Sequence, residues 1–293
     1  MDLQQLRYVV EVLDTASFTR AAERCFVTQS ALSHQIAALE REIGQRLFIR
    51  SSRSVRPTEA GEAFALQARI AVEAAENAVE EAAAAAGRIV GTLTLGVIPT
   101  VTAVDLPALL SGFRDKYPDV RVELRVGSSD MLMRQASTGE IDVALLGLRD
   151  DVRPQGVAFR ALRRDRLVVV LPTEHPLASR SEISLADLTD ETFADFPQGS
   201  SGRAQSDGAF ADAGIPRDVA FEVDTVDMLL GLVEAGLAVT LLAPGAVRGV
   251  HATVVVTPIV DGPHRTEYLA WHATGARSAA RAFVAQIESD AAR

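Results

Sequence analysis

The sequence lacks the features that would place the protein in a membrane or hold it together with disulfides. Its single cysteine, Cys25, cannot form a disulfide within the chain, so redox sensing by an internal disulfide is excluded, while a disulfide between two copies stays open. No segment approaches the roughly 20 apolar residues that span a bilayer, and residues 1–14 are amphipathic rather than a signal peptide. We therefore expect a cytoplasmic protein with no membrane partner, in which Cys25 is structural.

Sequence signatures of enzymes are also missing. Residues 199–202 (GSSG) come close to a nucleophile elbow but do not have its G-x-S-x-G spacing, and neither a phosphate loop nor a dinucleotide fingerprint occurs. The five histidines are scattered, with no pair at the spacing of metal ligands on a helix. His175 precedes a proline and is expected at a turn. We predict that the protein is not an enzyme and that it uses no cofactor and no metal.

Length and charge indicate more than one domain. The 293 residues exceed one typical domain, and 48% apolar residues are ample for two cores. The net charge of −10 by itself argues against a nucleic-acid partner. Residues 1–58, however, contain eight arginines and six acidic residues, so the acidic excess lies in the rest of the chain. Because the local field at the contact surface decides phosphate binding, a basic head on an acidic body is compatible with DNA binding.

Residues 17–58 have the layout of a winged helix-turn-helix, with two short amphipathic helices, a tight turn between them and an arginine-rich hairpin after them. Ser17 can cap the first helix and Thr28 the second. Apolar residues of the second helix recur at spacings of four, three and four, at Leu32, Ile36, Leu39 and Ile43. One face of this helix is therefore committed to the core.

The opposite face of the second helix carries side chains that can read base edges in a major groove. After Gly44, where the helix is expected to stop, arginines recur without an acid between residues 43 and 58, which suits contact with phosphates. An arginine run alone is more often a solvated surface, but the helix pair before it favours DNA. The predicted base-reading residues are Gln29, Ser30, Ser33 and His34, and the predicted backbone contacts are Arg50, Arg53 and Arg56.

The chain resembles the LysR-type transcriptional regulators. The resemblance is carried by the ordered string AAxxCxVTQSALSHQIxxLExxIGxxLFxRxxRxVxPTxAG, which runs from Ala21 to Gly61. It implies sequence-specific binding to double-stranded operator DNA and assembly into homodimers and homotetramers. Two positions depart from the family pattern: Cys25 replaces a usual leucine, and His34 replaces a common arginine, which can alter the preferred operator bases.

Residues 58–86 predict one long helix, since they contain no proline and are dominated by strong helix formers between Thr58 and Gly87. About 28 residues correspond to roughly 42 Å. Small residues form a narrow seam on this helix, at Phe64, Ala68, Ala71, Ala75, Ala78, Ala82 and Ala85. The seam either packs within its own domain or, as the resemblance implies, pairs antiparallel with a second copy.

From residue 89 onward, short apolar runs alternate with helical segments, which indicates parallel sheets covered by helices. Strands are expected at 93–97, 121–126, 143–146, 167–171, 219–223, 238–242, 254–256 and 268–271. Helices are expected at 106–117, 131–138, 202–213, 226–234 and 278–289. The resemblance implies a two-lobed domain similar to periplasmic solute-binding proteins, with lobe I at about 91–162 and 267–293 and lobe II at about 163–266.

The expected fold is therefore multidomain. An α-rich winged helix-turn-helix head (1–58) precedes a linker and dimerisation helix (59–88) and an α/β two-lobed effector-binding domain (89–293). Ligands of such sheets lie beyond the carboxyl ends of the strands. Hydroxyl and backbone N–H groups there suit a small anion, although each hydroxyl alone is better explained as a helix cap. The predicted effector-binding residues are Pro99, Thr100, Val101, Thr102, Ser128, Ser129, Gly147, Gln198, Gly199, Ser200, Ser201, Thr225 and Val226.

Two functions compete for this sequence. The favoured one is a ligand-responsive transcription factor that places paired winged heads on a dyad-symmetric operator and is modulated by a small anionic metabolite between the lobes. The rival is a solute receptor or small-molecule enzyme that shares only the two-lobed body. The rival explains none of residues 1–60 and has no export signal and no catalytic residues to support it.

Overall fold

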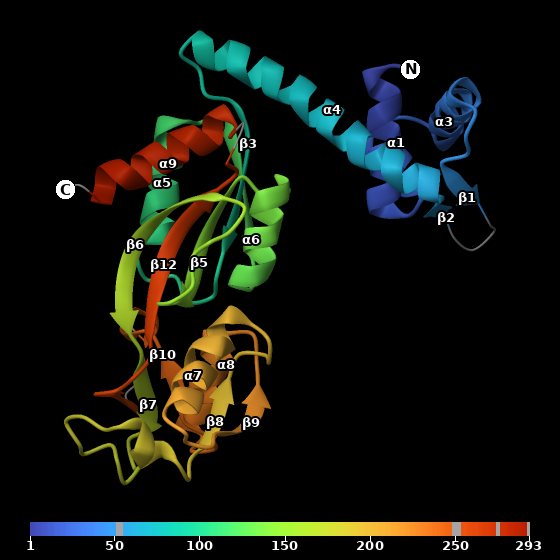
Figure 1. Cartoon of the computed structure of the whole chain (residues 1–293). Coiled ribbons are helices and arrows are strands. Elements are labelled where there is room, and N and C mark those ends of the chain that lie inside the picture. The colour runs from blue at the N-terminus through green and yellow to red at the C-terminus, as the bar shows by residue number, and fades with distance from the viewer. Residues whose placement is uncertain (51–54, 248–252, 274–275, 292–293) are drawn as a thin grey trace. The chain divides into compact units, whose positions relative to one another are not determined.

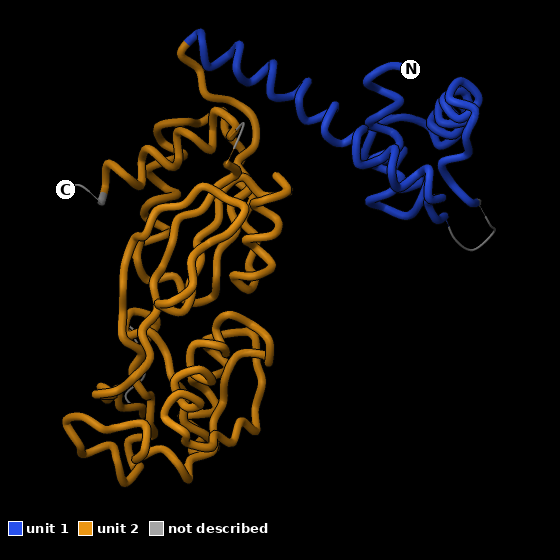
Figure 2. Tube along the Cα trace, in the orientation of Figure 1, with its two compact units in different colours: residues 1–86 blue, residues 87–293 orange. Residues whose placement is uncertain are grey.

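The computed structural model describes residues 1–50, 55–247, 253–273 and 276–291. The chain folds as two compact units, Met1–Ala86 and Gly87–Arg293 (Figure 2). The long predicted helix belongs to the N-terminal unit, together with the predicted head. In the described part of the chain, no helix is both long enough and apolar enough to cross a bilayer.

The N-terminal unit has the predicted helix-turn-helix and wing. Its elements are α1 (Leu3–Thr15), α2 (Phe18–Arg24), α3 (Gln29–Ile43), β1 (Phe48–Arg50), β2 (Val55–Pro57) and α4 (Glu59–Ala85) (Figure 1). Ser17, Thr28 and Thr58 each accept a hydrogen bond from the backbone N–H three residues on, so each caps the helix that follows it. Gly44 ends α3 in the left-handed conformation.

The face of α4 that packs in its own unit is only partly the predicted seam. Ala65, Ala68 and Val72 are buried, and Phe64 packs against the core formed by α1, α2 and α3. The first part of the predicted seam therefore packs against α1, α2 and α3 of its own unit. Beyond it, Val79 is 69% exposed.

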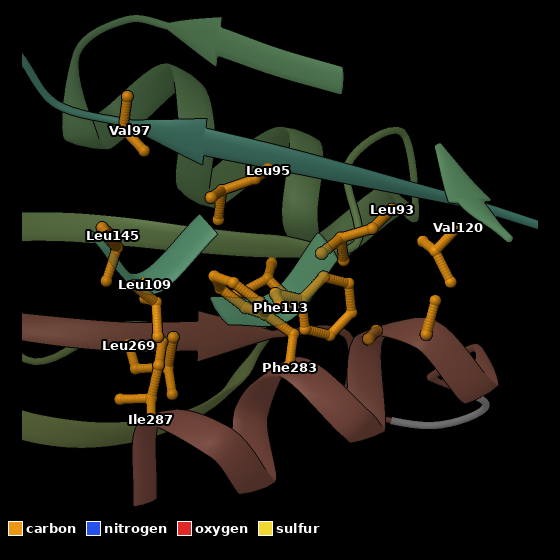
Figure 3. Packing of buried hydrophobic residues seen from close by; sticks show 13 residues of the cluster. Leu93, Leu95, Val97, Leu109, Phe113, Val120, Leu145, Leu269, Phe283 and Ile287 are labelled. Carbon is orange, nitrogen blue, oxygen red and sulfur yellow. The ribbon is translucent and has the colours of Figure 1, made fainter. Parts of the chain in front are cut away.

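The C-terminal unit begins with a five-stranded sheet, the first lobe. Its strand order is β4-β3-β5-β12-β6, with bounds β3 (Gly91–Val97), β4 (Val120–Val126), β5 (Val143–Arg149), β6 (Ala158–Arg166) and β12 (His264–Trp271). The helices of this lobe are α5 (Leu106–Lys116), α6 (Ser129–Thr138) and α9 (Ser278–Ala291). Its main core lies between the sheet and helices α5 and α9, where the rings of Phe113 and Phe283 meet edge to face at 5.2 Å (Figure 3).

The second lobe is built on β7 and its two neighbours, in the order β10-β7-β11. The strands are β7 (Val168–Pro172), β10 (Thr240–Leu242) and β11 (Val254–Pro258), and a separate parallel pair consists of β8 (Thr192–Asp195) and β9 (Asp218–Glu222). Its helices are α7 (Ser201–Asp212) and α8 (Val226–Glu234), with single 3-10 turns at Leu185–Leu188 and Pro244–Val247.

The expectation of parallel sheets is right only in part. β3 pairs in parallel with β4 and β5, but β12 is antiparallel to both β5 and β6, and β7 is antiparallel to both β10 and β11. The reason is the path of the chain: β6 leads from the first lobe into the second and β12 leads back, so these two adjacent strands run in opposite directions (Figure 1).

Two strands were missed by the sequence analysis. β6 was missed because its sequence AFRALRRDR contains four arginines and no apolar alternation. It lies at the edge of the sheet, where solvent accepts the charged side chains. β8 is only four residues long. β12 extends from His264, well before the predicted start at residue 268, because its first residues are polar yet buried.

Candidate DNA-binding surface and effector cleft

Helix α3 separates a buried face from a polar exposed face. Leu32, Ile36 and Leu39 are fully buried, whereas Gln29, Ser30 and His34 are exposed and Ser33 is half-buried. The four polar residues lie on one side of the helix, as the sequence predicted. Gln29 donates from its side-chain amide to the Ser33 hydroxyl at 3.1 Å, which orients an amide able to bond a base bidentately.

The wing is tied to α3 by one carboxylate. Glu40 Oε1 accepts the backbone N–H groups of Leu47 and Phe48 at 2.8 and 3.2 Å. This contact fixes the start of the β1–β2 hairpin relative to the recognition helix. The role of Glu40 had no signal in the sequence, because its partners are backbone atoms seven and eight residues away.

The predicted wing arginines are only partly described. Arg56 lies on β2, is exposed, and is paired in register with Ile49 of β1. Arg50 ends β1. Arg53 lies outside the described residues, and its prediction stays untested.

The turn between α2 and α3 contains an unusual residue. Phe26 is in the left-handed conformation (φ 55°) and its side chain is 95% exposed. Its N–H bonds to Glu23 O and the next N–H, of Val27, bonds to Ala22 O, the pattern that normally ends a helix on glycine. The turn therefore forms through its backbone bonds despite an aromatic side chain.

A cavity of about 490 Å³ lies between the two lobes of the C-terminal unit, a volume in the usual range for a small-molecule site. Several predicted effector-binding residues line it, namely Pro99, Thr100, Ser128, Ser129, Gly147, Gln198, Gly199 and Ser200. Most of them follow the carboxyl ends of β3, β4 and β8, as expected for ligand sites on such sheets. Gly147 instead lies within β5, which continues to Arg149, three residues beyond the predicted end at residue 146.

The other predicted effector residues lie outside this lining. Val101 packs against the cores of the first lobe. Thr102 donates from its N–H to the Glu267 carboxylate at 3.0 Å, and Ser201 bonds to Asp130. Thr225 caps α8 by accepting from Met228 N, and Val226 packs in the second lobe. Local spacing placed these residues near strand ends, but the side chains turn toward protein partners instead.

The cavity also has lining residues that the sequence analysis missed. The most informative is Arg265 on β12, whose side chain is 3% exposed and forms an ion pair at 2.5 Å with Glu267, itself 2% exposed. Arg265 also donates to the hydroxyl and carbonyl oxygens of Thr100, both at 2.8 Å. Burial lowers the pKa of Arg265, and the carboxylates of Glu267 and Asp165 oppose this shift.

Most other lining residues missed by the sequence analysis are apolar. They include Ile98, Val126, Met131, Leu167, Phe196, Pro197, Leu241, Leu242 and Ala243. Gln205, on α7, donates to Gly147 O at 3.1 Å. Among the described residues that line the cavity, Asp224 and Arg265 are the only ionisable ones. These residues come from strands and helices distant in sequence, so no local motif could have grouped them. Among the described residues, no group of histidine, cysteine and acidic side chains could hold a metal ion.

The two units match two parts of one known protein family. Residues 3–62 match the bacterial regulatory helix-turn-helix protein of the lysR family, and residues 86–292 match the LysR substrate binding domain. The chain belongs to the LysR family of transcriptional regulators. It therefore combines a DNA-binding unit with an effector-binding unit, the multidomain arrangement that the sequence predicted.

Individual LysR proteins resemble the chain over nearly its whole length. The Hca operon transcriptional activator HcaR of Escherichia coli (strain K12) is 34% identical over 98% of this chain and 97% of its own. The transcriptional dual regulator GltC of Bacillus subtilis (strain 168) is 34% identical over 83% of this chain and 80% of its own. Both are regulators by name, in line with a regulatory rather than an enzymatic role.

Solved structures of full-length relatives show the same architecture. A full-length OxyR from Pseudomonas aeruginosa has a TM-score of 0.75 and 28% identity, covering 99% of this chain and 94% of its own. CbnR complexed with its target DNA has a TM-score of 0.70 and 25% identity, covering 99% of both chains.

Proposed function

We propose that this LysR regulator reads operator bases with α3 and holds the DNA backbone with its wing. The observation that carries the proposal is the two-faced α3, whose buried leucine and isoleucine side chains leave Gln29, Ser30 and His34 exposed together. Amide, hydroxyl and imidazole groups on the leading turns of a recognition helix suit base-edge contact. The structure of the relative CbnR with its target DNA supports the same use of this unit.

Base readout and backbone contact have different signatures in binding. We expect His34→Ala to cost about 1–3 kcal/mol on the operator and little on random DNA, because a base contact exists only at its cognate pair. We expect Arg56→Ala to weaken both duplexes alike and to reduce the salt slope by about one unit, because a phosphate contact is independent of sequence.

The test is a fluorescence anisotropy titration of the full chain with operator and random duplexes at several salt concentrations. Arg88→Ala is the matched control, since Arg88 is an exposed arginine outside the head that pairs with Asp119. An equal loss of specificity in His34→Ala and Arg56→Ala would contradict the division of roles.

We infer further that the effector is a small molecule with one carboxylate and an apolar body. The support is the lining of the cavity: the Thr100 and Ser128 hydroxyls and the Arg265 guanidinium lie at the first lobe, and Phe196, Leu241 and Leu242 supply apolar surface from the second. The buried Nε of Arg265 has no hydrogen-bond partner among the described residues, so it retains a donor.

The charges of the residues that line the cavity limit how many carboxylates the effector can carry. Glu267 already neutralises Arg265 at 2.5 Å, and the other ionisable lining residue, Asp224, is acidic. One carboxylate can accept from the two hydroxyls and from the unpartnered Nε of Arg265. The described lining offers no second cation, so a second carboxylate would lose its hydration without compensation. Such a ligand would shift the equilibrium between two arrangements of the lobes by the difference in its affinity for them. This shift would in turn change the affinity for the operator.

A further inference from the structure

A hydrogen-bonded contact joins the two lobes beside the effector cleft, next to the lining residues Ser129 and Ser200. Asp130, in the first turn of α6, belongs to the first lobe, and Ser201, the first residue of α7, belongs to the second. The Asp130 carboxylate oxygen Oδ2 accepts the backbone N–H of Ser201 at 2.9 Å and its hydroxyl at 2.5 Å. Ser201 is 8% exposed and Asp130 is half-buried, so this contact is partly shielded from water.

The contact uses the chemistry of a helix end. The first N–H groups of a helix have no partner within the helix, and the helix dipole favours a negative charge there. A carboxylate that accepts two bonds at this position is held by charge-assisted hydrogen bonds, which are stronger than neutral ones. Asp130 therefore binds α7 as a bound anion would, but from the other lobe.

Helix α7 does not need Asp130 in order to form. Ser200 caps it already, because its hydroxyl accepts the N–H of Arg203 at 3.2 Å. Asp130 likewise does not cap α6, since Ser128 does so by accepting from Met131 N. The Asp130–Ser201 bonds thus serve the contact between lobes rather than either helix.

A second contact of α7 with the first lobe is polar as well. Gln205 is 4% exposed and donates to Gly147 O of β5 at 3.1 Å. Hydrogen-bonding groups regain water partners when they separate, whereas apolar surfaces do not. Such contacts therefore cost less to break than the burial of an apolar surface of the same area.

We propose that Asp130 is a latch that keeps the effector cleft closed when no ligand is bound. The inference rests on the proposed effector role of this cleft and adds its regulation. A ligand then shifts the lobes only through the difference in its affinity for the latched and the open arrangement. Loss of the latch populates the open arrangement without ligand.

Hydrogen exchange of the Ser201 amide in the full-length protein reports on the latch directly. In Asp130→Ala, we expect this amide to exchange at least about tenfold faster, since it loses a charge-assisted acceptor. Ser201→Ala keeps the N–H and removes only the hydroxyl, so the lobes should open less in this variant than in Asp130→Ala. Asp227→Ala is the matched control, because Asp227 is also the second residue of a capped helix, α8, and is exposed.

Lobe separation is measured on the same variants by electron paramagnetic resonance between spin labels. The labels are attached to Thr138→Cys in the first lobe and Ala211→Cys in the second, both exposed positions, in a Cys25→Ser background. Longer distances in Asp130→Ala but not in Asp227→Ala would support the latch. Faster exchange with unchanged distances would overturn it, because Asp130 would then only shield one amide. Neither measurement needs ligand or DNA, so failure here is distinct from failure of ligand binding to the cleft.

Discussion

At the scale of single residues, the cleft depends on a buried charge that is satisfied almost entirely by protein groups. The terminal nitrogens of Arg265 donate to Thr100 and Glu267, whereas its Nε has no hydrogen-bond partner among the described residues. Glu267 in turn also accepts the N–H groups of Thr102 and Ala103, each at 3.0 Å. A cation fixed in this way is preorganised, so a ligand need not order it on binding.

The proposed ligand class predicts a specific loss at Thr100. Thr100→Val keeps the shape and removes a hydroxyl that can donate to a carboxylate, so ligand affinity should fall by about 1.5–3 kcal/mol. Ligands are first found by thermal shift of the full chain against matched sets of monocarboxylic acids, their amides and dicarboxylic acids, and affinities are then measured by calorimetry.

Thr225→Val provides the control for this substitution. The Thr225 hydroxyl also accepts one hydrogen bond, from Met228 N, but Thr225 does not line the cavity, so its variant should bind the ligand normally. Equal affinities of Thr100→Val and the unmodified protein, or equal binding of acids and their amides, would contradict the proposed ligand class.

At the scale of elements, the crossing strands β6 and β12 carry a cluster of charges near the lobe junction. Arg164 pairs with Asp150 at 2.6 Å, and Arg166 Nε donates to His264 Nε2 at 3.3 Å. Burial lowers the pKa of His264, and the positive charges of Arg164 and Arg166 lower it further, while Asp150 acts in the opposite direction. Neutral imidazole is therefore the form that the folded protein prefers.

This lowered pKa predicts a pH dependence of stability. When the pKa of a histidine is lower in the folded than in the unfolded state, protonation of that histidine favours unfolding. Its contribution to the free energy of unfolding is therefore complete above the unfolded pKa of about 6.5 and is lost as the pH falls through the folded pKa. His264→Gln keeps an acceptor for Arg166 but cannot gain a proton. Between about pH 7.5 and pH 5.5, the unfolding temperature should therefore fall less in His264→Gln than in the unmodified full chain.

The matched control removes a different imidazole. His34 lies exposed in the other unit, so His34→Gln should retain the pH dependence of the unmodified protein. If the unfolding temperature fell equally with pH in the unmodified protein, His264→Gln and His34→Gln, His264 would not contribute to the pH dependence of stability.

At the scale of the whole molecule, we expect two copies of the chain to associate through the face of α4 that is exposed in a single copy. Val79 is 69% exposed, although its neighbour Glu80 is buried within the unit, and Ala75 one turn before it is half-buried. Large exposed apolar side chains on a long helix are typical of a helix-pairing face. The predicted pairing of two copies through this helix stays a proposal for this chain.

Val79→Glu tests the pairing without disturbing the fold of one chain. The side chain is exposed in a single copy, so folding should be unchanged, but a carboxylate buried between two helices without a partner should cost about 3 kcal/mol or more. Sedimentation velocity should show a shift toward monomer, with weaker operator binding as a consequence.

An added carboxylate elsewhere separates this effect from charge alone. Ala211→Glu introduces a carboxylate at an exposed position of α7 and should leave the sedimentation profile as it was. An unchanged profile for Val79→Glu as well would place the interface on another surface.

The local elements of this protein were determined by the sequence itself. The caps Ser17, Thr28 and Thr58 and the apolar spacing of α3 act within a few residues, so they predict the helix-turn-helix, its exposed face and the long helix α4. Hydroxyl groups after strand ends were visible for the same reason, and Thr100 and Ser128 do line the cavity.

Only the tertiary structure decided which distant residues meet. β12 pairs with β5 and β6, which lie about a hundred residues or more earlier in the chain. This pairing makes the sheet mixed and brings Arg265 into contact with Thr100. The contact of Asp130 with Ser201 spans 71 residues. Such pairings depend on the packing of whole elements rather than on local propensity. The partners of a charged strand such as β6, or of a residue in a buried ion pair, therefore cannot be predicted from the neighbouring sequence.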